Sequence, residues 1–260
     1  MKNKITVEIC CASANDVFEA ALAGAGRVEL NSALSLGGLT PSIGTLMAVQ
    51  YEFQYWHDAE ENFVPPKIFT MIRPREGGFC YSEFEYQTML YDVEKMIEHG
   101  SDGIVFGILH ADGSVDEKRC RQILSLVDPL PAVFHRAIDV VPDWRRSMDS
   151  LIDLGFKRLL TSGQERSALE GRETIRQMRE YAAGRIEILP AAGISSGNVK
   201  ELLEYTGCDQ VHLSMMRTGA DDSTSSNSKV HFGGKLPSSE SIYSLADRKK
   251  IAAFVHQVNS

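Results

Sequence analysis

The chain has 260 residues, of which 43% are hydrophobic and 24% are charged, and its formal net charge is −8. This composition is ordinary for a globular protein and excludes large-scale disorder, while the acidic balance argues against a nucleic-acid partner. No apolar run reaches the roughly 18 residues of a membrane span, and the N-terminus lacks the apolar core of a signal peptide. These features predict a cytoplasmic protein with no membrane contact.

Eight short apolar runs alternate with segments of helical periodicity, which indicates an α/β fold with a parallel sheet. The predicted strands span residues 5–10, 27–31, 67–73, 103–109, 132–136, 158–161, 186–189 and 210–213. Eight even units fit a single (β/α)₈ TIM barrel, which typically has about 250 residues, so residues 1–260 are predicted to form one domain. An open doubly wound sheet is the alternative, but no Gly-x-Gly-x-x-Gly motif follows the first strand.

Two segments carry further expectations. A polar stretch over 215–239 predicts a long loop after the eighth strand, either a lid over the barrel or a mobile segment, and a final helix is expected over 240–257. The predicted second helix contains Tyr51, Phe53, Tyr55 and Trp56, and such an aromatic stripe is typical of a core or a subunit interface. We therefore expect a homo-oligomer.

Ionisable side chains recur at the ends of the predicted strands, where a parallel barrel would bring them to one rim. Glu8 and Glu29 occupy matching positions in the first two strands. Two buried carboxylates cannot both stay charged unless an arginine, a protonated histidine or a metal balances them. An internal salt-bridge network is the structural interpretation, and an acid/base pair is the functional one. His135 would face the barrel interior if Val133 does, because side chains alternate along a strand.

A second group of residues predicts an anion site. Small residues at the ends of the sixth and seventh strands let backbone N–H groups approach a ligand, and a helix beginning near residue 196 would present its positive end. Barrel enzymes often bind phosphate in this region. The candidate anion-binding residues are Arg73, Arg136, Ser162, Gly193, Ser195 and His212.

The cysteines do not form a recognisable framework. They number five (Cys10, Cys11, Cys80, Cys120 and Cys208) and none belongs to a Cys-x-x-Cys pair. Disulfides and a structural zinc site are therefore not expected. Cys10 stands apart because it lies where the first strand reaches the rim. No lysine lies at the end of a predicted strand, which disfavours Schiff-base chemistry.

Several of these segments, taken in order through nearly the whole chain, resemble the CutC family. They are Val7-Glu8-Ile9-Cys10, Arg27-Val28-Glu29-Leu30, Gly37-Gly38-Leu39-Thr40-Pro41-Ser42, Met71-Ile72-Arg73-Pro74-Arg75, Gly77-Gly78-Phe79-Cys80-Tyr81-Ser82, Phe134-His135-Arg136-Ala137 and Leu160-Thr161-Ser162-Gly163. The resemblance implies a TIM barrel, a cytoplasmic location and a role in copper homeostasis. It also implies Cu(I) ligands at cysteines that end the first two strands. Cys10 fills the first position, but Asn31 stands in the second, and an amide is a poor ligand for Cu(I).

Two hypotheses from different classes follow, with a third as a variant. The first is a copper-homeostasis protein that binds Cu(I) through Cys10. The second is an enzyme that acts on a small phosphorylated or carboxylated metabolite, with Glu8, Glu29 and His135 as acid and base and Arg73 on the anion. In the third, Glu8, Glu29 and a histidine hold a divalent metal.

Overall fold

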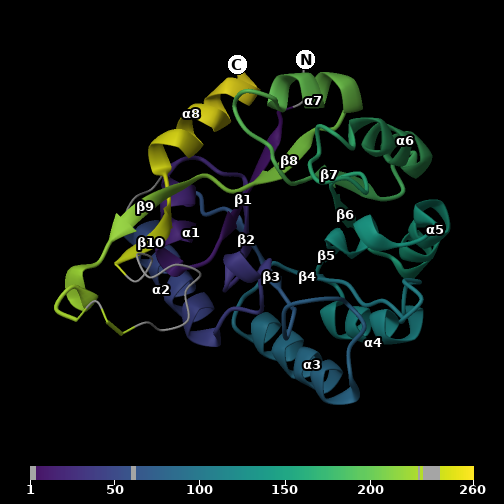
Figure 1. Cartoon of the computed structure of the whole chain (residues 1–260), viewed down its shortest axis with the longest axis horizontal. Helices are drawn as coiled ribbons and strands as arrows, with labels where there is room; N and C mark the ends of the chain where they lie inside the picture. The colour runs from purple at the N-terminus through teal and green to yellow at the C-terminus, as the bar shows by residue number, and fades with distance from the viewer. Residues whose placement is uncertain (1–3, 60–62, 228, 231–240) are drawn as a thin grey trace.

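The computed structural model describes residues 4–59, 63–227, 229–230 and 241–260. Its centre is a sheet of eight parallel strands in the order β7-β6-β5-β4-β3-β2-β1-β8, and a parallel bridge between Ala191 and His212 brings the two edge strands together. Figure 1 shows the strands as a ring with helices outside it. The strands are β1 (Thr6–Cys11), β2 (Arg27–Leu30), β3 (Lys67–Met71), β4 (Gly103–Phe106), β5 (Ala132–Phe134), β6 (Arg158–Thr161), β7 (Glu187–Pro190) and β8 (Gln210–Leu213). The predicted TIM barrel is confirmed.

Helices follow the strands in sequence and cover the outside of the ring. They are α1 (Ala14–Leu22), α2 (Ile43–Ala59), α3 (Glu83–Glu98), α4 (Glu117–Val127), α5 (Trp144–Leu154), α6 (Arg172–Ala182), α7 (Val199–Thr206) and α8 (Arg248–Asn259). Short side chains cap several of them. The hydroxyl of Ser13 accepts from the N–H of Asp16, and Ser82 with Glu85 forms a complete capping box, which satisfies backbone donors that a helix start leaves free.

Four strands, β2 to β5, end earlier than the sequence predicts, and beyond β3 and β5 the next residues build the rim. Beyond β3, the backbone N–H of Arg73 donates to the hydroxyl of Thr40. Beyond β5, His135 is the N-cap of the short 3₁₀ helix η2 (Arg136–Val140). These terminal residues therefore carry side chains into the mouth without continuing the sheet.

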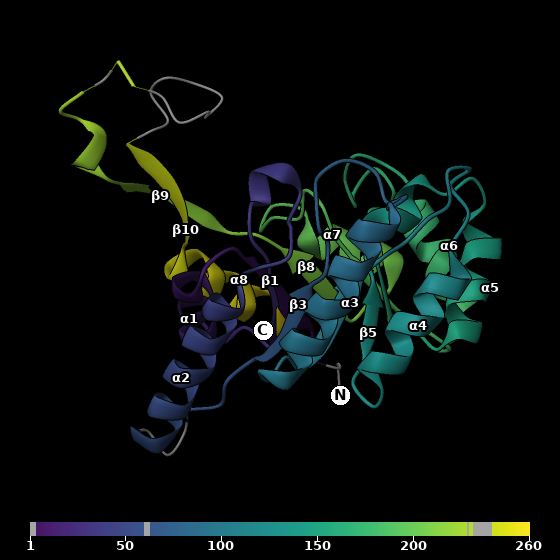
Figure 2. The same ribbon diagram turned by 90° about the horizontal axis from the view of Figure 1, so that it is seen from below.

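The segment after β8 differs from the expected loop. An antiparallel hairpin forms from β9 (Met216–Ala220) and β10 (Ile242–Ala246), and it projects beyond the barrel in Figure 2. The carboxylate of Asp16 accepts the N–H of Ala246 and so joins the hairpin to α1. The final helix begins at Arg248, because residues 242–246 pair as a strand. Residues 228 and 231–240 of the predicted loop lie outside the described part, so its proposed mobility stays a prediction.

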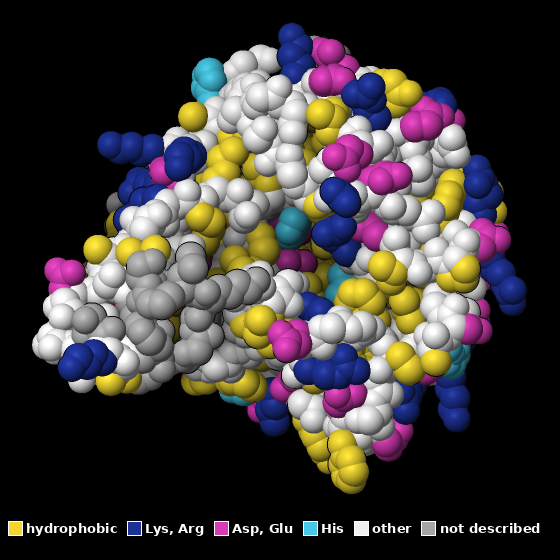
Figure 3. Space-filling view, in the orientation of Figure 1, with side chains coloured by type: hydrophobic (Ala, Val, Ile, Leu, Met, Phe, Trp, Pro, Cys, Tyr) yellow, Lys and Arg dark blue, Asp and Glu magenta, His cyan; other side chains and the backbone are white. Residues whose placement is uncertain are grey.

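The described strands of the hairpin lie beside α1, and the lid interpretation stays a prediction because residues 231–240 lie outside the described part. At the mouth, Figure 3 shows histidine, acidic and basic side chains together in a hollow at the centre of the face. In the regions that the structure describes, no helix is both long and apolar enough to cross a bilayer. The cytoplasmic location remains a prediction.

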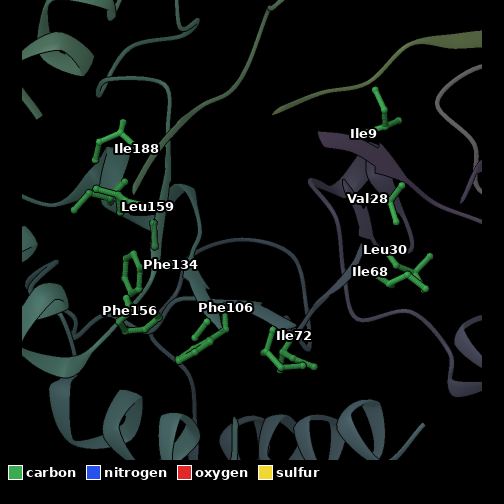
Figure 4. Packing of buried hydrophobic residues seen from close by; sticks show 14 of the residues in the cluster. Ile9, Val28, Leu30, Ile68, Ile72, Phe106, Phe134, Phe156, Leu159 and Ile188 are labelled. Carbon is green, nitrogen blue, oxygen red and sulfur yellow. The ribbon is translucent and has the colours of Figure 1, made fainter. Parts of the chain in front are cut away.

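Apolar side chains fill two layers. Those that point outward from the strands pack beneath the helices, where Figure 4 shows residues such as Ile9, Val28, Phe106 and Phe134. A smaller cluster fills the barrel itself, with Phe69, Met71, Val105, Val133, Leu160, Leu189 and Ala191. The residues of this inner cluster lie on β3 to β7 and directly after β7. The inward positions of β1, β2 and β8 are therefore occupied by polar residues.

The aromatic helix α2 divides its side chains between the core and the surface. Phe53 is buried, while Tyr51 and Tyr55 are exposed together with Met47. Trp56 packs against Phe18 of α1. Part of the aromatic stripe is therefore core, and the self-association expected of the exposed part stays a prediction.

Candidate functional site

Strand alternation and register bring the polar residues of three neighbouring strands together. In β1 and β2, Cys10 pairs with Glu29, and in β1 and β8, Glu8 pairs with His212. Alternate residues share a face of the sheet, so these side chains point into the barrel on the side away from the apolar inner cluster. The two carboxylates and the imidazole are buried, with Glu8 at 1%, Glu29 at 3% and His212 at 9% exposed.

The negative charge of Glu8 is balanced by two neighbouring cationic side chains. One of its oxygens pairs with the guanidinium of Arg27, and the other lies 2.7 Å from Nδ1 of His212. Burial alone would raise the pKa of Glu8, but Arg27 and His212 lower it to about 2. Glu8 is therefore ionised near neutral pH, and it fixes the orientation of the His212 ring.

Glu29, Cys10 and His212 form a compact group of potential metal ligands, whose ligand atoms all lie within 4.8 Å of one another. The Cys10 thiol donates to Oε2 of Glu29 at 3.7 Å, and Nε2 of His212 lies 3.9 Å from the same oxygen. Oε1 of Glu29 is buried without a hydrogen-bond partner. A buried, unpaired carboxylate oxygen beside a thiol and an imidazole is a place where a cation would gain ligands.

The same surroundings shift the proton equilibria of this group. Burial raises the pKa of the Cys10 thiol to about 12, and burial with the nearby Glu8 carboxylate raises the pKa of Glu29. Burial opposes the charged form of His212, but Glu29, Cys10 and Glu8 together raise its pKa well above the usual value. The ion-free site therefore holds a protonated thiol and an imidazolium near neutral pH.

Asn31 occupies the position at which the family resemblance implies a second cysteine. Its amide nitrogen donates to Oε2 of Glu29 at 2.8 Å and lies 3.4 Å from Sγ of Cys10. Its buried Oδ1 has no hydrogen-bond partner. Asn31 thus holds Glu29 and Cys10 in place through its N–H groups.

A layer of arginines below the carboxylates supplies the balancing charge that the sequence requires. Arg27 donates to Oε1 of Gln210 at 2.8 Å, and Arg158 donates to the same oxygen at 3.0 Å. Arg158 also pairs with Glu187 at 2.6 Å. Sequence reasoning missed this layer because Arg27 and Arg158 begin their strands, although both lie two residues before an inward-facing position.

Arg73 lies on the other side of the mouth and is only 7% exposed. Its guanidinium donates to the carbonyl oxygens of Leu36, Gly38 and Gly77, at 3.1, 3.1 and 2.8 Å. Its face lies over the ring of Phe79, 5.3 Å from the centroid. Arg73 therefore joins two rim loops, and Nε remains buried without a partner.

His135 faces the interior, as predicted from Val133, which belongs to the inner apolar cluster. Its ring packs 4.7 Å from that of Phe79, and Nδ1 accepts the N–H of Ala137 at 3.2 Å. Burial and the charge of Arg73 lower the pKa of His135 to about 3. The ring is therefore neutral and carries its proton on Nε2, which is buried without a partner.

The remaining predicted anion ligands are engaged within the protein. Arg136 pairs with Asp139 at 2.8 Å and donates to the hydroxyl of Ser162 at 2.7 Å. Asp139 also accepts the N–H of Ser162. In the loop after β7, the N–H of Ser195 donates to Oδ1 of Asn198. The amide of Asn198 donates in turn to the carbonyl oxygen of Gly193 at 2.8 Å.

The predicted site residues thus fall into separate groups. Glu8, Glu29, Cys10 and His212 meet directly, and Arg73 and His135 meet through Phe79. His212, rather than His135, contacts the carboxylates. The sequence could have indicated this contact, because strand alternation points both Glu8 and His212 inward. The two side chains meet because the eighth strand lies beside the first.

Together these observations define a TIM-barrel protein whose C-terminal mouth combines a thiol–carboxylate–imidazole cluster with an arginine–histidine pair. A family model for the CutC family matches residues 5–217. The chain belongs to the CutC family.

Individual relatives agree with this assignment. A CutC family protein of Treponema denticola is 46% identical over 93% of this chain and 94% of its own length. A human protein named copper homeostasis protein cutC homolog is 39% identical over 96% of this chain and 87% of its own length. A crystal structure of a Streptococcus agalactiae protein, named there "putative copper homeostasis protein CutC", superposes with a TM-score of 0.72 at 35% identity, covering 80% of this chain and 97% of that one. A role in copper homeostasis is therefore supported at the level of the family.

Proposed function

We propose that the protein binds Cu(I) at the barrel mouth, with Cys10 and His212 as ligands and Glu29 beside them. The observation that carries the proposal is the convergence of these three side chains from β1, β2 and β8 within 4.8 Å. Thiolate and imidazole are donors that suit copper. The names of the relatives, which refer to copper homeostasis, agree with this choice of metal.

The residue set fits a thiolate–imidazole site better than a site with two thiolates. Asn31 turns its amide N–H groups toward Glu29 and Cys10. An N–H group is a donor, so the side of Asn31 that faces Cys10 and Glu29 offers a metal no ligand atom. His212 takes the second ligand position in its place. Its Nδ1 lies against Glu8, and a carboxylate on the far nitrogen is a common support for a metal-binding histidine. Nε2 is then the nitrogen that faces the metal.

Binding requires two protons to leave: the Cys10 proton, since the thiolate is the metal ligand, and the proton on Nε2 of the His212 imidazolium, which passes to solvent because only a neutral imidazole binds a metal. Burial makes the loss of the thiol proton unfavourable in the ion-free protein, where the pKa of Cys10 is about 12. The existing hydrogen bond from the thiol to Glu29 gives this proton a nearby acceptor. The charge of the bound cation then offsets the burial of the thiolate.

A Cys10→Ser variant is expected to abolish stoichiometric Cu(I) binding, because it replaces the soft ligand with a hydroxyl. The measurement is a titration of the reduced protein against a chromogenic Cu(I) chelator. Cys80→Ser is the matched control, since Cys80 is an exposed thiol in the loop after β3 and its loss should leave binding unchanged. Tight Cu(I) binding that persists in Cys10→Ser would show that Cys10 is not the copper ligand.

A second candidate function rests on the hydrogen bond between Glu8 and Nδ1 of His212. A carboxylate that orients an imidazole, whose other nitrogen faces the mouth, is an arrangement used for proton transfer. We infer an enzyme that moves a proton on a small phosphorylated or carboxylated metabolite. His212 takes the acid/base role, and Glu29 lies next to its Nε2.

This second function predicts that the protein catalyses the exchange of carbon-bound hydrogen with solvent. The assay follows small 2-oxo and 2-hydroxy carboxylates and sugar phosphates in D₂O by proton NMR. His212→Gln should abolish exchange, whereas His256→Gln, which alters an exposed histidine of α8, should not. Absence of exchange across the panel, or its survival in His212→Gln, would argue against the enzyme.

A further inference from the structure

The arginines that are buried in the described part of the barrel differ in how their charge is balanced. Arg27 pairs with Glu8, and Arg158 pairs with Glu187. Arg73 is buried to the same degree, at 7% exposed, but the groups around its guanidinium are neutral: three carbonyl oxygens accept from it, and the Tyr81 hydroxyl lies beside it. A buried guanidinium without a counter-ion is unfavourable, so the site around Arg73 favours an anion.

Two buried donors around Phe79 have no acceptor. They are Nε of Arg73 and Nε2 of His135. The nitrogen of His135 must be a donor, because Nδ1 already accepts the N–H of Ala137. Phe79 contacts both side chains, with the guanidinium carbon of Arg73 5.3 Å from its ring centroid and the ring centroid of His135 4.7 Å away. Unsatisfied buried donors in a native structure call for a partner.

Close packing holds the imidazole in this position. A Cβ atom added at Gly107 would lie 2.6 Å from Cε1 and Nδ1 of His135, so glycine at this point of the rim lets the ring lie against the backbone. Hydrogen bonds from Arg73 to three carbonyl oxygens hold the two rim loops in place. The two free N–H groups are thus preorganised rather than mobile, which favours binding.

We propose that Arg73 and His135 form an oxyanion site that binds a small carboxylate in the barrel mouth. A single guanidinium and a neutral imidazole give the site one positive charge, which matches a carboxylate better than a phosphate dianion. The two N–H donors suit the two oxygens of a carboxylate. Phe79 supplies an apolar wall beside them.

Unpartnered acceptors on the opposite side of the mouth favour a ligand that also carries a hydrogen-bond donor. There, Oε1 of Glu29 and Oδ1 of Asn31 are buried acceptors without partners. Gly38 links the two sides, because its carbonyl accepts from Arg73, while a Cβ atom added to it would lie 2.6 Å from Oδ1 of Asn31. A short hydroxy-carboxylate complements this arrangement, with its carboxylate toward Arg73 and its hydroxyl toward Glu29.

The test measures binding of sodium glycolate to the full chain by ligand-observed NMR, with acetamide as the neutral comparison and inorganic phosphate as the competing anion. Saturable binding of glycolate is expected. Arg73→Met and His135→Phe should each weaken it by about tenfold or more, the factor associated with one charge-assisted hydrogen bond. His135→Phe keeps an aromatic ring against Phe79 and decides the result if Arg73→Met does not fold.

Two controls separate this site from its surroundings. Arg75 lies on the same loop but already pairs with Glu85, so Arg75→Met should leave glycolate binding unchanged. Arg73→Met should retain Cu(I) binding, because the guanidinium is not among the proposed copper ligands. Loss of Cu(I) binding and loss of carboxylate binding would thus appear in different variants. Absence of saturable glycolate binding, tighter binding of phosphate, or an equal loss in Arg75→Met would overturn the proposal.

Discussion

Arg27→Met is expected to lower the free energy of unfolding by about 3–5 kcal/mol at neutral pH, the range for removing one partner of a buried ion pair. The guanidinium pairs with Glu8 and donates to Gln210, and it also lies over the ring of Phe69, 5.5 Å from the centroid. Its removal leaves the Glu8 carboxylate buried with His212 as the remaining partner of opposite charge. Urea denaturation of the wild-type and variant proteins measures the difference.

The pH dependence of this loss identifies Glu8 as its origin. The pKa of Glu8 is lowered from 4.5 to about 2 in the folded protein, so its ionised form contributes stability that is fully present above about pH 4.5. That contribution is lost as the pH falls toward 2. The difference between wild type and Arg27→Met should shrink over the same interval.

An exposed ion pair provides the control for Arg27→Met. Arg176 pairs with Glu173 and Glu180 on the surface of α6, and such pairs contribute about 0–1 kcal/mol. Arg176→Met should therefore have little effect. A loss in Arg27→Met no larger than that in Arg176→Met would show that the buried pair does not balance the barrel carboxylates.

Gly163→Ala is expected to lower the free energy of unfolding by about 3 kcal/mol or more, which is a large effect for one methyl group. Gly163 has φ of +73°, in the left-handed region. A Cβ atom there would lie 2.3 Å from the carbonyl oxygen of Gly171. Because backbone cannot move aside as a flexible side chain does, the loop from 163 to 171 would have to separate. Thermal and urea denaturation measure the loss.

Gly184→Ala isolates the contribution of the close approach. Gly184 has a similar φ of +79°, but a Cβ atom there meets nothing within 4 Å. Only the left-handed conformation opposes alanine at this position, which amounts to about 1–2 kcal/mol. Equal losses in the two variants would mean that the contact between Gly163 and Gly171 does not matter for stability.

The parallel barrel was predictable because each of its units carries a local signal. Short apolar runs such as the one around Val28 end in polar residues, and a capping serine such as Ser82 marks the helix that follows. The hairpin of β9 and β10 was not predictable in the same way. Its strands have few buried residues, so they lack the apolar alternation by which a strand is recognised.

The candidate site was predicted as a set of residues but not as an arrangement. Glu8, Glu29, Arg73 and His135 all reach the mouth, as the strand ends indicated. The partners of each differ from those expected, since His212 contacts the acids while His135 lies beside Phe79. Arg136 was predicted to face a ligand, but it binds Asp139 and Ser162.

The amino-acid sequence by itself determined the strand–helix alternation, the residues at the rim, and the need to balance two buried acids, because these follow from local periodicity and from the electrostatics of burial. Only the tertiary structure decided which cation balances which acid. That choice depends on strand register and on the meeting of β1 with β8, two segments some 200 residues apart whose pairing no local pattern encodes. Among the described residues, the same closure pairs the acids of β1 and β2 with Arg27 and His212, and Arg73 has no carboxylate partner there.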